Sequence, residues 1–231
     1  MSARALIFDL DNTLIDRRAA FARWLDWWCA AHDLTLTGRQ RADALALDDD
    51  GYAPREAVCA FLGRLATPMR TAEGVWGDMR AHLGRMITPE PEIHALLNTL
   101  SAQGHRLAIV SNGGSQNQRA KLAASGLAAL FEPDLILISE ELGVAKPDPD
   151  IYHEALWRLD ALPHHTTFIG DHPAQDVVAP AREGLRTCWI SMGRPWPHEL
   201  EVRPDVVMTS LASPPLRLSA TPPLSPGCGE G

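Results

Sequence analysis

Lysine is scarce in this sequence, and a positive charge balance is missing altogether. The 231 residues include 21 basic side chains, of which only two are lysines, Lys121 and Lys146. The 29 acidic residues outnumber the basic ones and give a formal net charge of −8. A protein that binds nucleic acid or an anionic membrane normally needs a basic face, so the charge argues against both partners.

Long apolar runs, nucleotide-binding motifs and paired cysteines are also missing. No stretch approaches the ~20 apolar residues of a membrane span, and Asp9 ends the N-terminal apolar run too early for a signal peptide. There is no GxxxxGK(S/T) segment, which disfavours a P-loop enzyme. The four cysteines are scattered without a CxxC pair, a pattern typical of free thiols in a reducing cytoplasm. We therefore expect a cytoplasmic protein.

Short apolar runs alternate with helical patterns over most of the chain. The runs are 5–8, 107–110, 135–138, 167–169, 187–190 and, more weakly, 206–208. Continuous apolar runs of this length are typical of strands buried on both faces. Strands that alternate with helices predict a parallel sheet. The expected fold class is therefore α/β, a Rossmann-like parallel sheet with helices on both faces.

Residues 17–87 interrupt this alternation with helical apolar stripes and no convincing strand. A crossover between parallel strands needs only one helix, and about 70 residues is far more than that. The segment therefore predicts an all-helical cap domain inserted after the first strand. The expected organisation is a core of residues 1–16 and 88–211, a cap of residues 17–87, and a disordered tail of residues 212–231 rich in Pro, Ser and Gly.

Polar side chains gather just beyond the predicted strands or in the loop before the next helix. They are Asp9, Asp11, Ser111, Asn112, Gly113, Lys146, Asp171 and Asp176. Ligands of an open parallel sheet bind beyond the carboxyl ends of its strands, so these residues are expected to share one site. Crowded carboxylates need a cation, and oxygen ligands with an open face suit Mg²⁺ bound to a phosphate. Hydroxyl, amide and glycine N–H groups, with a lysine, complete a site for phosphoryl transfer.

Four segments resemble, in order, the motifs of the haloacid dehalogenase-like hydrolase superfamily. They are FDLDNTL at 8–14, VSNGG at 110–114, GVAKPDPDIY at 143–152 and GDHPAQD at 170–176. The resemblance covers about residues 4–208. The helical insertion is similar to the cap shared by phosphoglycolate phosphatases, haloacid dehalogenases and related nucleotidases.

The resemblance implies catalytic roles for three residues and a supporting role for a fourth. Asp9 would be the nucleophile that forms an aspartyl-phosphate. Asp11 would protonate the leaving oxygen and then act as the base for water. Lys146 would neutralise charge and steady Asp9, while Asp176 would orient Lys146 or a metal-bound water.

The same resemblance implies two sets of ligands. Mg²⁺ would be held by Asp9, Asp171 and the backbone carbonyl of Asp11. The transferring phosphoryl oxygens would be bound by Ser111, Asn112 and Gly113.

Two features of the sequence separate the branches of the superfamily. Haloacid dehalogenases lack an acid at the position matching Asp11, so its presence disfavours carbon–halogen cleavage. Phosphonate hydrolases use a cap lysine, and residues 17–87 contain none. The expected function is Mg²⁺-dependent hydrolysis of a small phosphorylated metabolite: a nucleoside monophosphate, or a sugar or glycolate phosphate. The alternatives are a phosphomutase of the same superfamily and a catalytically idle protein that binds a phosphate ligand.

Charged residues of the insertion have more than one interpretation. Arg17, Arg18 and Arg55 can meet a substrate anion, but a surface role is the preferred interpretation for each. The acidic residues at 48–50 predict a solvated turn before Gly51 rather than a metal site. The sequence sets neither the oligomeric state nor the cap residues that contact the substrate.

Overall fold

The computed structural model describes residues 5–212, and its centre is one sheet in which all neighbouring strands are parallel. Its six strands have the order β3-β2-β1-β4-β5-β6. They are β1 (Ala5–Phe8), β2 (Arg106–Ser111), β3 (Ile136–Ile138), β4 (Thr166–Gly170), β5 (Arg186–Ile190) and β6 (Val206–Met208). A strand lies at each of the six apolar runs of the sequence. The predicted α/β fold class is confirmed.

The central strand β1 is buried on both faces, and its side chains alternate between two apolar clusters. Leu6 and Phe8 belong to the larger cluster, while Ala5 and Ile7 belong to the smaller one on the opposite face. Ile7 pairs with Ala108 of β2 and with Phe168 of β4. A strand that is buried on both faces has apolar residues at successive positions, and this continuous run made the strand predictable from the sequence.

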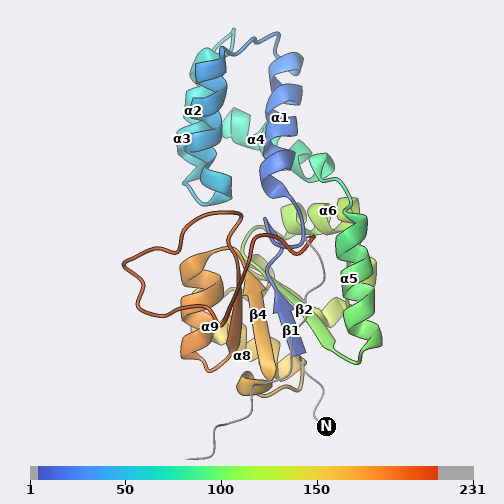
Figure 1. Ribbon diagram of the computed structural model, residues 1–231. Coiled ribbons are helices and arrows are strands. Elements are labelled where there is room, and N and C mark those ends of the chain that lie inside the picture. The colour runs from blue at the N-terminus through green and yellow to red at the C-terminus, as the bar shows by residue number, and fades with distance from the viewer. Residues whose placement is uncertain (1–4, 213–231) are drawn as a thin grey trace, which may run out of the picture.

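Helices cover both faces of the sheet (Figure 1). They are α5 (Pro91–Ala102), α6 (Ser115–Ser125), α7 (Ser139–Leu142), α8 (Pro149–Arg158) and α9 (Ala179–Arg182). The apolar side chains of α5 and α6 join the larger cluster, and those of α8 join the smaller one. The end of α6 is fixed by Gly126, whose φ of 73° is the left-handed conformation that terminates many helices.

Short 3₁₀ and π segments connect the larger elements. They are η1 (Asp49–Gly51), η2 (Leu83–Met86), η3 (Leu127–Leu130), η4 (Pro133–Leu135), η5 (Pro163–His165) and the π-helix η6 (Pro173–Val178). The π-helix follows β4 after only two residues and carries Asp176. Wide turns of this kind are frequent at functional sites because they re-aim a side chain within a helix.

Residues 17–87 lie beyond the carboxyl ends of the strands and contain helices but no strand (Figure 1). The four main helices are α1 (Arg17–Ala31), α2 (Gly38–Asp48), α3 (Arg55–Leu65) and α4 (Ala72–His82). Trp24 and Trp28 are fully buried among them. The predicted boundaries of core and cap stay a prediction. All of the predicted tail except Ala212 lies outside the described residues.

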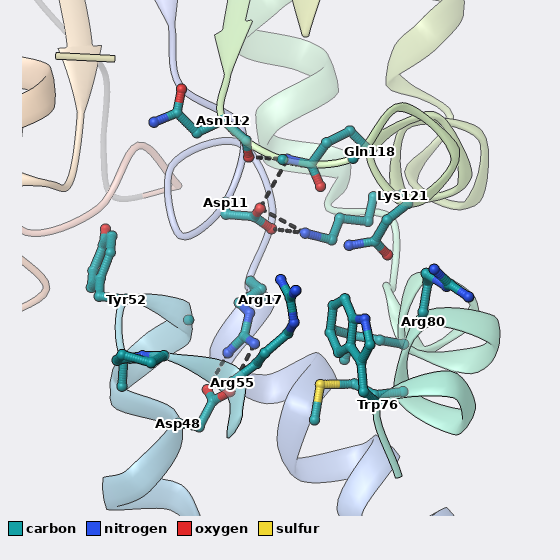
Figure 2. Close-up of a pocket in the computed structure, with 18 of the residues that line it drawn as sticks. Asp11, Arg17, Asp48, Tyr52, Arg55, Trp76, Arg80, Asn112, Gln118 and Lys121 are labelled. Carbon is teal, nitrogen blue, oxygen red and sulfur yellow. Dashed lines mark hydrogen bonds and ion pairs between the residues drawn. The ribbon is translucent and has the colours of Figure 1, made fainter. Parts of the chain in front are cut away.

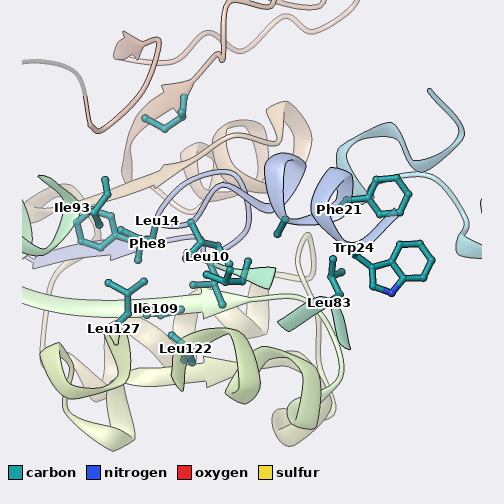
Figure 3. Close-up of a cluster of buried hydrophobic side chains, with 14 of the residues drawn as sticks. Phe8, Leu10, Leu14, Phe21, Trp24, Leu83, Ile93, Ile109, Leu122 and Leu127 are labelled. Atoms are coloured by element: carbon teal, nitrogen blue, oxygen red, sulfur yellow. The ribbon is translucent and has the colours of Figure 1, made fainter. Parts of the chain in front are cut away.

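Cap and sheet share one apolar cluster. Leu10 and Leu14 continue the line of β1 toward Phe21 and Trp24 of α1, and Leu83 of η2 reaches the same cluster (Figure 3). A side chain at Gly84 would place its Cβ 3.0 Å from Cβ of Ala120, so glycine here lets η2 pack closely on α6. The cap is therefore held directly against the helix that carries part of the site. Within residues 5–212, no helix is long and apolar enough to cross a bilayer.

Candidate active site

Asp9 follows β1 directly and is tied to the core by its backbone and its side chain. Its N–H donates to the carbonyl of Ile169 at 2.8 Å. Lys146, in the loop between α7 and α8, donates from Nζ to Asp9 Oδ1 at 2.7 Å and to Asp176 Oδ1 at 2.8 Å. All three side chains are buried. The structure thus brings together three residues that are 137 and 30 positions apart in the chain.

Three carboxylates converge at this point. Asp9, Asp171 and Asp176 each offer one oxygen, and these oxygens all lie within 4.8 Å of one another. Asp176 lies so close to Gly170 that a Cβ there would be 2.4 Å from its carboxyl group. Glycine at the end of β4 is therefore required for the third carboxylate to reach the cluster. The resemblance implied a supporting role for Asp176, and the structure places its carboxyl group within the cluster itself.

The electrostatics of the cluster match an all-oxygen cation site. Burial raises the pKa of Asp9 well above its ordinary value despite Lys146, and burial together with Asp176 raises the pKa of Asp171 to about 7. The buried Oδ1 of Asp171 has no hydrogen-bond partner among the described residues. A hard divalent cation such as Mg²⁺ satisfies this set, because it prefers oxygen ligands and offsets the crowded negative charge. The residues present therefore fit the metal.

Asp11 points away from that cluster, toward α6. Lys121 Nζ lies 2.7 Å from Asp11 Oδ1 and 2.6 Å from Oδ2, and Gln118 Nε2 donates to Oδ2 at 3.1 Å (Figure 2). Burial by itself would raise the pKa of Asp11, but the charge and hydrogen bonds of Lys121 outweigh it and lower the pKa. The two lysines of the chain are thus paired one each with Asp9 and Asp11.

The predicted phosphate-binding residues lie at the end of β2, with their polar groups already engaged. Ser111 Oγ accepts from Gln118 Nε2 at 2.5 Å, which leaves its own proton free to donate. Asn112 donates to the carbonyl of Lys146 at 2.8 Å and accepts from its N–H at 2.9 Å. The N–H of Gly113 donates to Ser139 Oγ at 3.0 Å. Asn112 therefore fixes the loop that presents Lys146.

A loop of the cap closes over this edge of the sheet. Arg17 and Asp48 form a buried ion pair with two hydrogen bonds, and Asn12 Nδ2 donates to the carbonyl of Asp50 at 2.9 Å. Arg18 also binds the Asp50 carboxylate. The expectation of a solvated turn is wrong for Asp48 and Asp50, because two arginines at the start of α1 pair with them. The expected surface role of Arg17 is wrong for the same reason.

Tyr52 extends this loop to the cluster of carboxylates formed by Asp9, Asp171 and Asp176. Its ring lies edge-on to His172 with centroids 4.6 Å apart, and it lines a cavity of about 170 Å³ together with Asp9, Asp171 and Asp176. Burial and these carboxylates raise the pKa of Tyr52 far above its ordinary value, so it stays a neutral phenol. A cap residue thus closes one side of the carboxylate site.

A second, larger cavity of about 590 Å³ lies between the cap and the core (Figure 2). It shares Asp11, Tyr52 and Asn112 with the smaller cavity. Its cap wall includes Arg55 and Trp76. The two cavities therefore meet at Asp11, between the carboxylate cluster and the cap.

Sequence reasoning assigned no role to Lys121, Gln118 or Tyr52. The scarcity of lysine was a usable signal for Lys121, and Gln118 lies one helical turn before it on the same face. Tyr52 carries no such signal, because only the docking of the cap brings it to the site.

Comparison with known proteins places the chain in a family. The model of the haloacid dehalogenase-like hydrolases matches residues 6–190, and the chain belongs to this family. It is 32% identical to a phosphoserine phosphatase from Thermus thermophilus, over 88% of this chain and 94% of that protein.

Solved structures show the same fold over nearly the whole chain. The magnesium-bound HAD-hydrolase YfnB from Bacillus subtilis has a TM-score of 0.74 and 25% identity, covering 91% of this chain and 96% of that one. A dehalogenase has a TM-score of 0.71 and 24% identity, covering 91% and 95%, and at this identity it shows a shared fold only. The expected superfamily is confirmed.

Proposed function

We propose that the protein is a Mg²⁺-dependent phosphomonoester hydrolase that acts on a small phosphorylated metabolite through an aspartyl-phosphate on Asp9. The observation that carries the proposal is the pairing of two neighbouring aspartates with different partners. Asp9 lies in the carboxylate cluster and is held by Lys146, whereas Asp11 faces the cap cavity and is held by Lys121. Two separately held carboxylates are what a nucleophile and a proton-transfer group require.

The first half-reaction joins phosphorus to Asp9. A carboxylate oxygen of Asp9 attacks, the bond from phosphorus to the leaving oxygen breaks, and the electron pair goes to that oxygen. The proton for the leaving oxygen comes from the Asp11 carboxyl group. Lys146 holds the Asp9 carboxylate in place through its 2.7 Å hydrogen bond and offsets negative charge as phosphate approaches.

The second half-reaction regenerates Asp9. Water attacks phosphorus, Asp11 takes its proton, and the bond between phosphorus and Asp9 breaks to release phosphate. Lys121 favours the carboxylate form of Asp11, which is the form that acts as the base in this step. The proton that Asp11 takes from water restores the acid form that the next cycle uses.

Two ligand sets near the strand ends are part of the proposal. Asp9, Asp171 and the backbone carbonyl of Asp11 are proposed to hold Mg²⁺, which would neutralise the carboxylates and polarise the phosphate oxygens. Asp176 fixes Lys146 through the 2.8 Å bond. The phosphoryl oxygens are proposed to be bound by a separate set at the end of β2, namely Ser111, Asn112 and Gly113.

Carbon–halogen cleavage is the activity of other proteins with this fold. It leaves a halide that needs no proton, so it gives no reason for a carboxylate held beside the cap cavity. Asp11 together with its partner Lys121 therefore favours a substrate with a leaving oxygen. The similarity to a phosphoserine phosphatase supports the same choice.

The test is release of phosphate from p-nitrophenyl phosphate with Mg²⁺ or with chelator. Wild-type protein should turn over only with the metal, and Asp9→Asn should lose at least about a thousandfold in rate because the nucleophile is gone. Asp43→Asn, on the exposed side of α2, is the matched control and should keep wild-type activity. An Asp9→Asn variant with full metal-dependent turnover would falsify the assignment of the nucleophile.

Intact-mass measurement of rapidly quenched enzyme provides a second readout. Wild-type protein should carry one added phosphoryl group during turnover, and the Asp9→Asn variant should carry none. Chloride release from a 2-haloacid, in place of phosphate release, would replace the proposal with a dehalogenase. Isomerisation of a sugar phosphate without free phosphate would replace it with a mutase.

A further inference from the structure

Most charges of the cap–core cavity are neutralised within the protein. Among its cations, Lys121 pairs with Asp11 and Arg17 pairs with Asp48. The carboxylate of Glu140 accepts a hydrogen bond from the N–H of Ser115 at 2.7 Å. The hydrogen bond leaves Glu140 charged, and the described core side of the cavity has no unpaired cation, so the cations open to a ligand lie on the cap wall.

Two arginines remain on that wall, and neither has a strong partner. Arg80 is exposed and makes no ion pair or hydrogen bond with any described residue. Arg55 lies 3.6 Å from the adjacent Glu56, but both side chains are more than half exposed, at 57% and 70%. Exposed pairs of this kind contribute little, so the Glu56 carboxylate does not saturate Arg55.

The indole of Trp76 packs against one of the two arginines and shares a helix face with the other. The guanidinium of Arg55 lies over its ring, 4.6 Å from the centroid. Arg80 follows Trp76 by four residues on α4, which places both on one face of the helix. Figure 2 shows the three side chains together on the cap side of the cavity, across from Asp11 and Lys121. The wall thus offers two planar donors whose hydrogen-bonding edges are not used by the protein.

A buried acceptor on the core side points independently to a ligand. Gln118 is only 1% exposed and uses Nε2 for Ser111 and Asp11, but its Oε1 has no partner among the described residues. Gln118 lines the same cavity as the two arginines. An unpaired buried acceptor is costly, and a hydrogen-bond donor in the cavity, from a ligand or a water, would satisfy it.

We propose that this cavity is the subsite for the leaving group of the substrate, and that this group carries a second anion. Arg55 and Arg80 bind the anion, a carboxylate or a second phosphate, and Gln118 Oε1 accepts from a neighbouring hydroxyl or ammonium. The subsite rests on the proposed function, because the cavity meets the carboxylate site at Asp11, where the leaving oxygen is released. Arginine suits the role because its planar fork binds carboxylate and phosphate through two hydrogen bonds.

Matched substrates test the second anion directly. 3-Phosphoglycerate and glycerol 3-phosphate differ by one carboxylate, and fructose 1,6-bisphosphate and fructose 6-phosphate differ by one phosphate. In at least one pair, the wild-type enzyme should favour the compound with the second anionic group by about tenfold or more in kcat/KM. This is the effect expected for hydrogen bonds to a charged group. The favoured pair identifies the anion. Equal or reversed preference in both pairs overturns the proposal.

Variants of the two arginines then test whether these side chains cause the preference for the second anion. Arg80→Met and Arg55→Met should each reduce kcat/KM about tenfold for the favoured member and less than twofold for its partner. Arg39→Met removes the same charge from an exposed position on α2 that does not line the cavity, and it should change neither value. A uniform loss on both members, or no loss, contradicts a subsite for the anion.

A binding measurement separates this proposal from the proposed hydrolysis. Calorimetric titration of Asp9→Asn protein with each member of a pair needs no turnover. The compound with the second anionic group should bind more tightly than its partner, and this difference should disappear in the Asp9→Asn/Arg80→Met double variant. Hydrolysis without this preference overturns the subsite alone, whereas the preference without hydrolysis of any phosphate overturns the proposed function alone.

Discussion

Asp9 and Asp11 are two residues apart, yet their carboxylates meet different surroundings. Asp9 ends a buried strand and shares Lys146 with Asp176. Asp11 follows Asp9 by two residues and forms an ion pair with Lys121 of α6. Burial raises the pKa of Asp9 despite Lys146, whereas Lys121 outweighs burial and lowers the pKa of Asp11. At the scale of single residues, this difference is what separates the proposed nucleophile from the proposed acid and base.

The role of Asp11 predicts an effect that depends on the leaving group. Asp11→Asn should slow hydrolysis of an alkyl phosphate by about a hundredfold or more, because the alkoxide leaves poorly without a proton. The same variant should lose much less with p-nitrophenyl phosphate, whose phenolate leaves unaided. Steady-state kcat/KM for the two substrates measures the difference. Equal losses would contradict the role as an acid.

The pairing with Lys121 predicts a change in the pH profile. Lys121→Met removes the cation that lowers the pKa of Asp11, so burial should raise that pKa. In the first half-reaction, which kcat/KM reports, Asp11 must be protonated, so the basic limb of the profile of kcat/KM against pH should move to higher pH. Lys121→Arg keeps the charge and should shift the limb less. An unshifted limb in the methionine variant would show that Lys121 does not tune Asp11.

At the scale of elements, the segment from α2 to Tyr52 joins the cap to the core. Its anchor is the Arg17–Asp48 pair, whose side chains are only 9% and 7% exposed. The next contacts are those of Asp50 with Asn12 and Arg18. Together they place Tyr52 over the carboxylate cluster. The cap thus enters the site through one short loop as well as through α3 and α4.

Loss of the anchor should be costly. Asp48→Ala leaves the buried guanidinium of Arg17 without its partner and should lower the free energy of unfolding by about 3 kcal/mol. Asp26→Ala breaks the exposed pair with Arg41 and should cost less than about 1 kcal/mol. Urea denaturation of both variants measures the contrast. Similar values for the two would show that the buried pair is not an anchor.

At the scale of the whole molecule, crowded carboxylates link stability to pH and metal. Without metal, the folded protein holds a proton on Asp171 up to a pKa of about 7, whereas an unfolded aspartate loses it near 3.8. The folded state therefore binds more protons between these values, and stability falls as pH rises through this window. A divalent cation offsets the charge and should reverse the loss.

Thermal unfolding at pH 5 and pH 8 tests this linkage. Metal-free protein should melt at a lower temperature at pH 8, and Mg²⁺ should raise the midpoint more at pH 8 than at pH 5, because protons compete with the metal. Asp171→Asn should make the metal-free midpoint higher than wild type at pH 8 and weaken the effect of Mg²⁺. A Mg²⁺ effect that is the same at both pH values, and unchanged in the variant, would refute the linkage.

The positions of the strands and of the motif residues follow from the sequence. Strands such as β1 are enclosed by helices on both faces, so their apolar runs are continuous, and the polar residues that follow them reach one edge of the sheet. Asp9, Lys146, Asp171 and Asp176 could be predicted to meet there because the topology of a parallel sheet fixes where strand ends lie.

Only the tertiary structure decided which side chains serve the site from outside these motifs. Lys121 binds Asp11 because the packing of α6 brings the two side chains together. Asp48 is buried in its pair with Arg17, which begins α1. Arg55 of α3 reaches Trp76 of α4, on the cavity wall that also includes Arg80, only once the two helices are docked. Local sequence patterns set the secondary structure and the chemistry of the strand ends. Contacts between distant elements depend on packing geometry, which no short pattern of residues encodes.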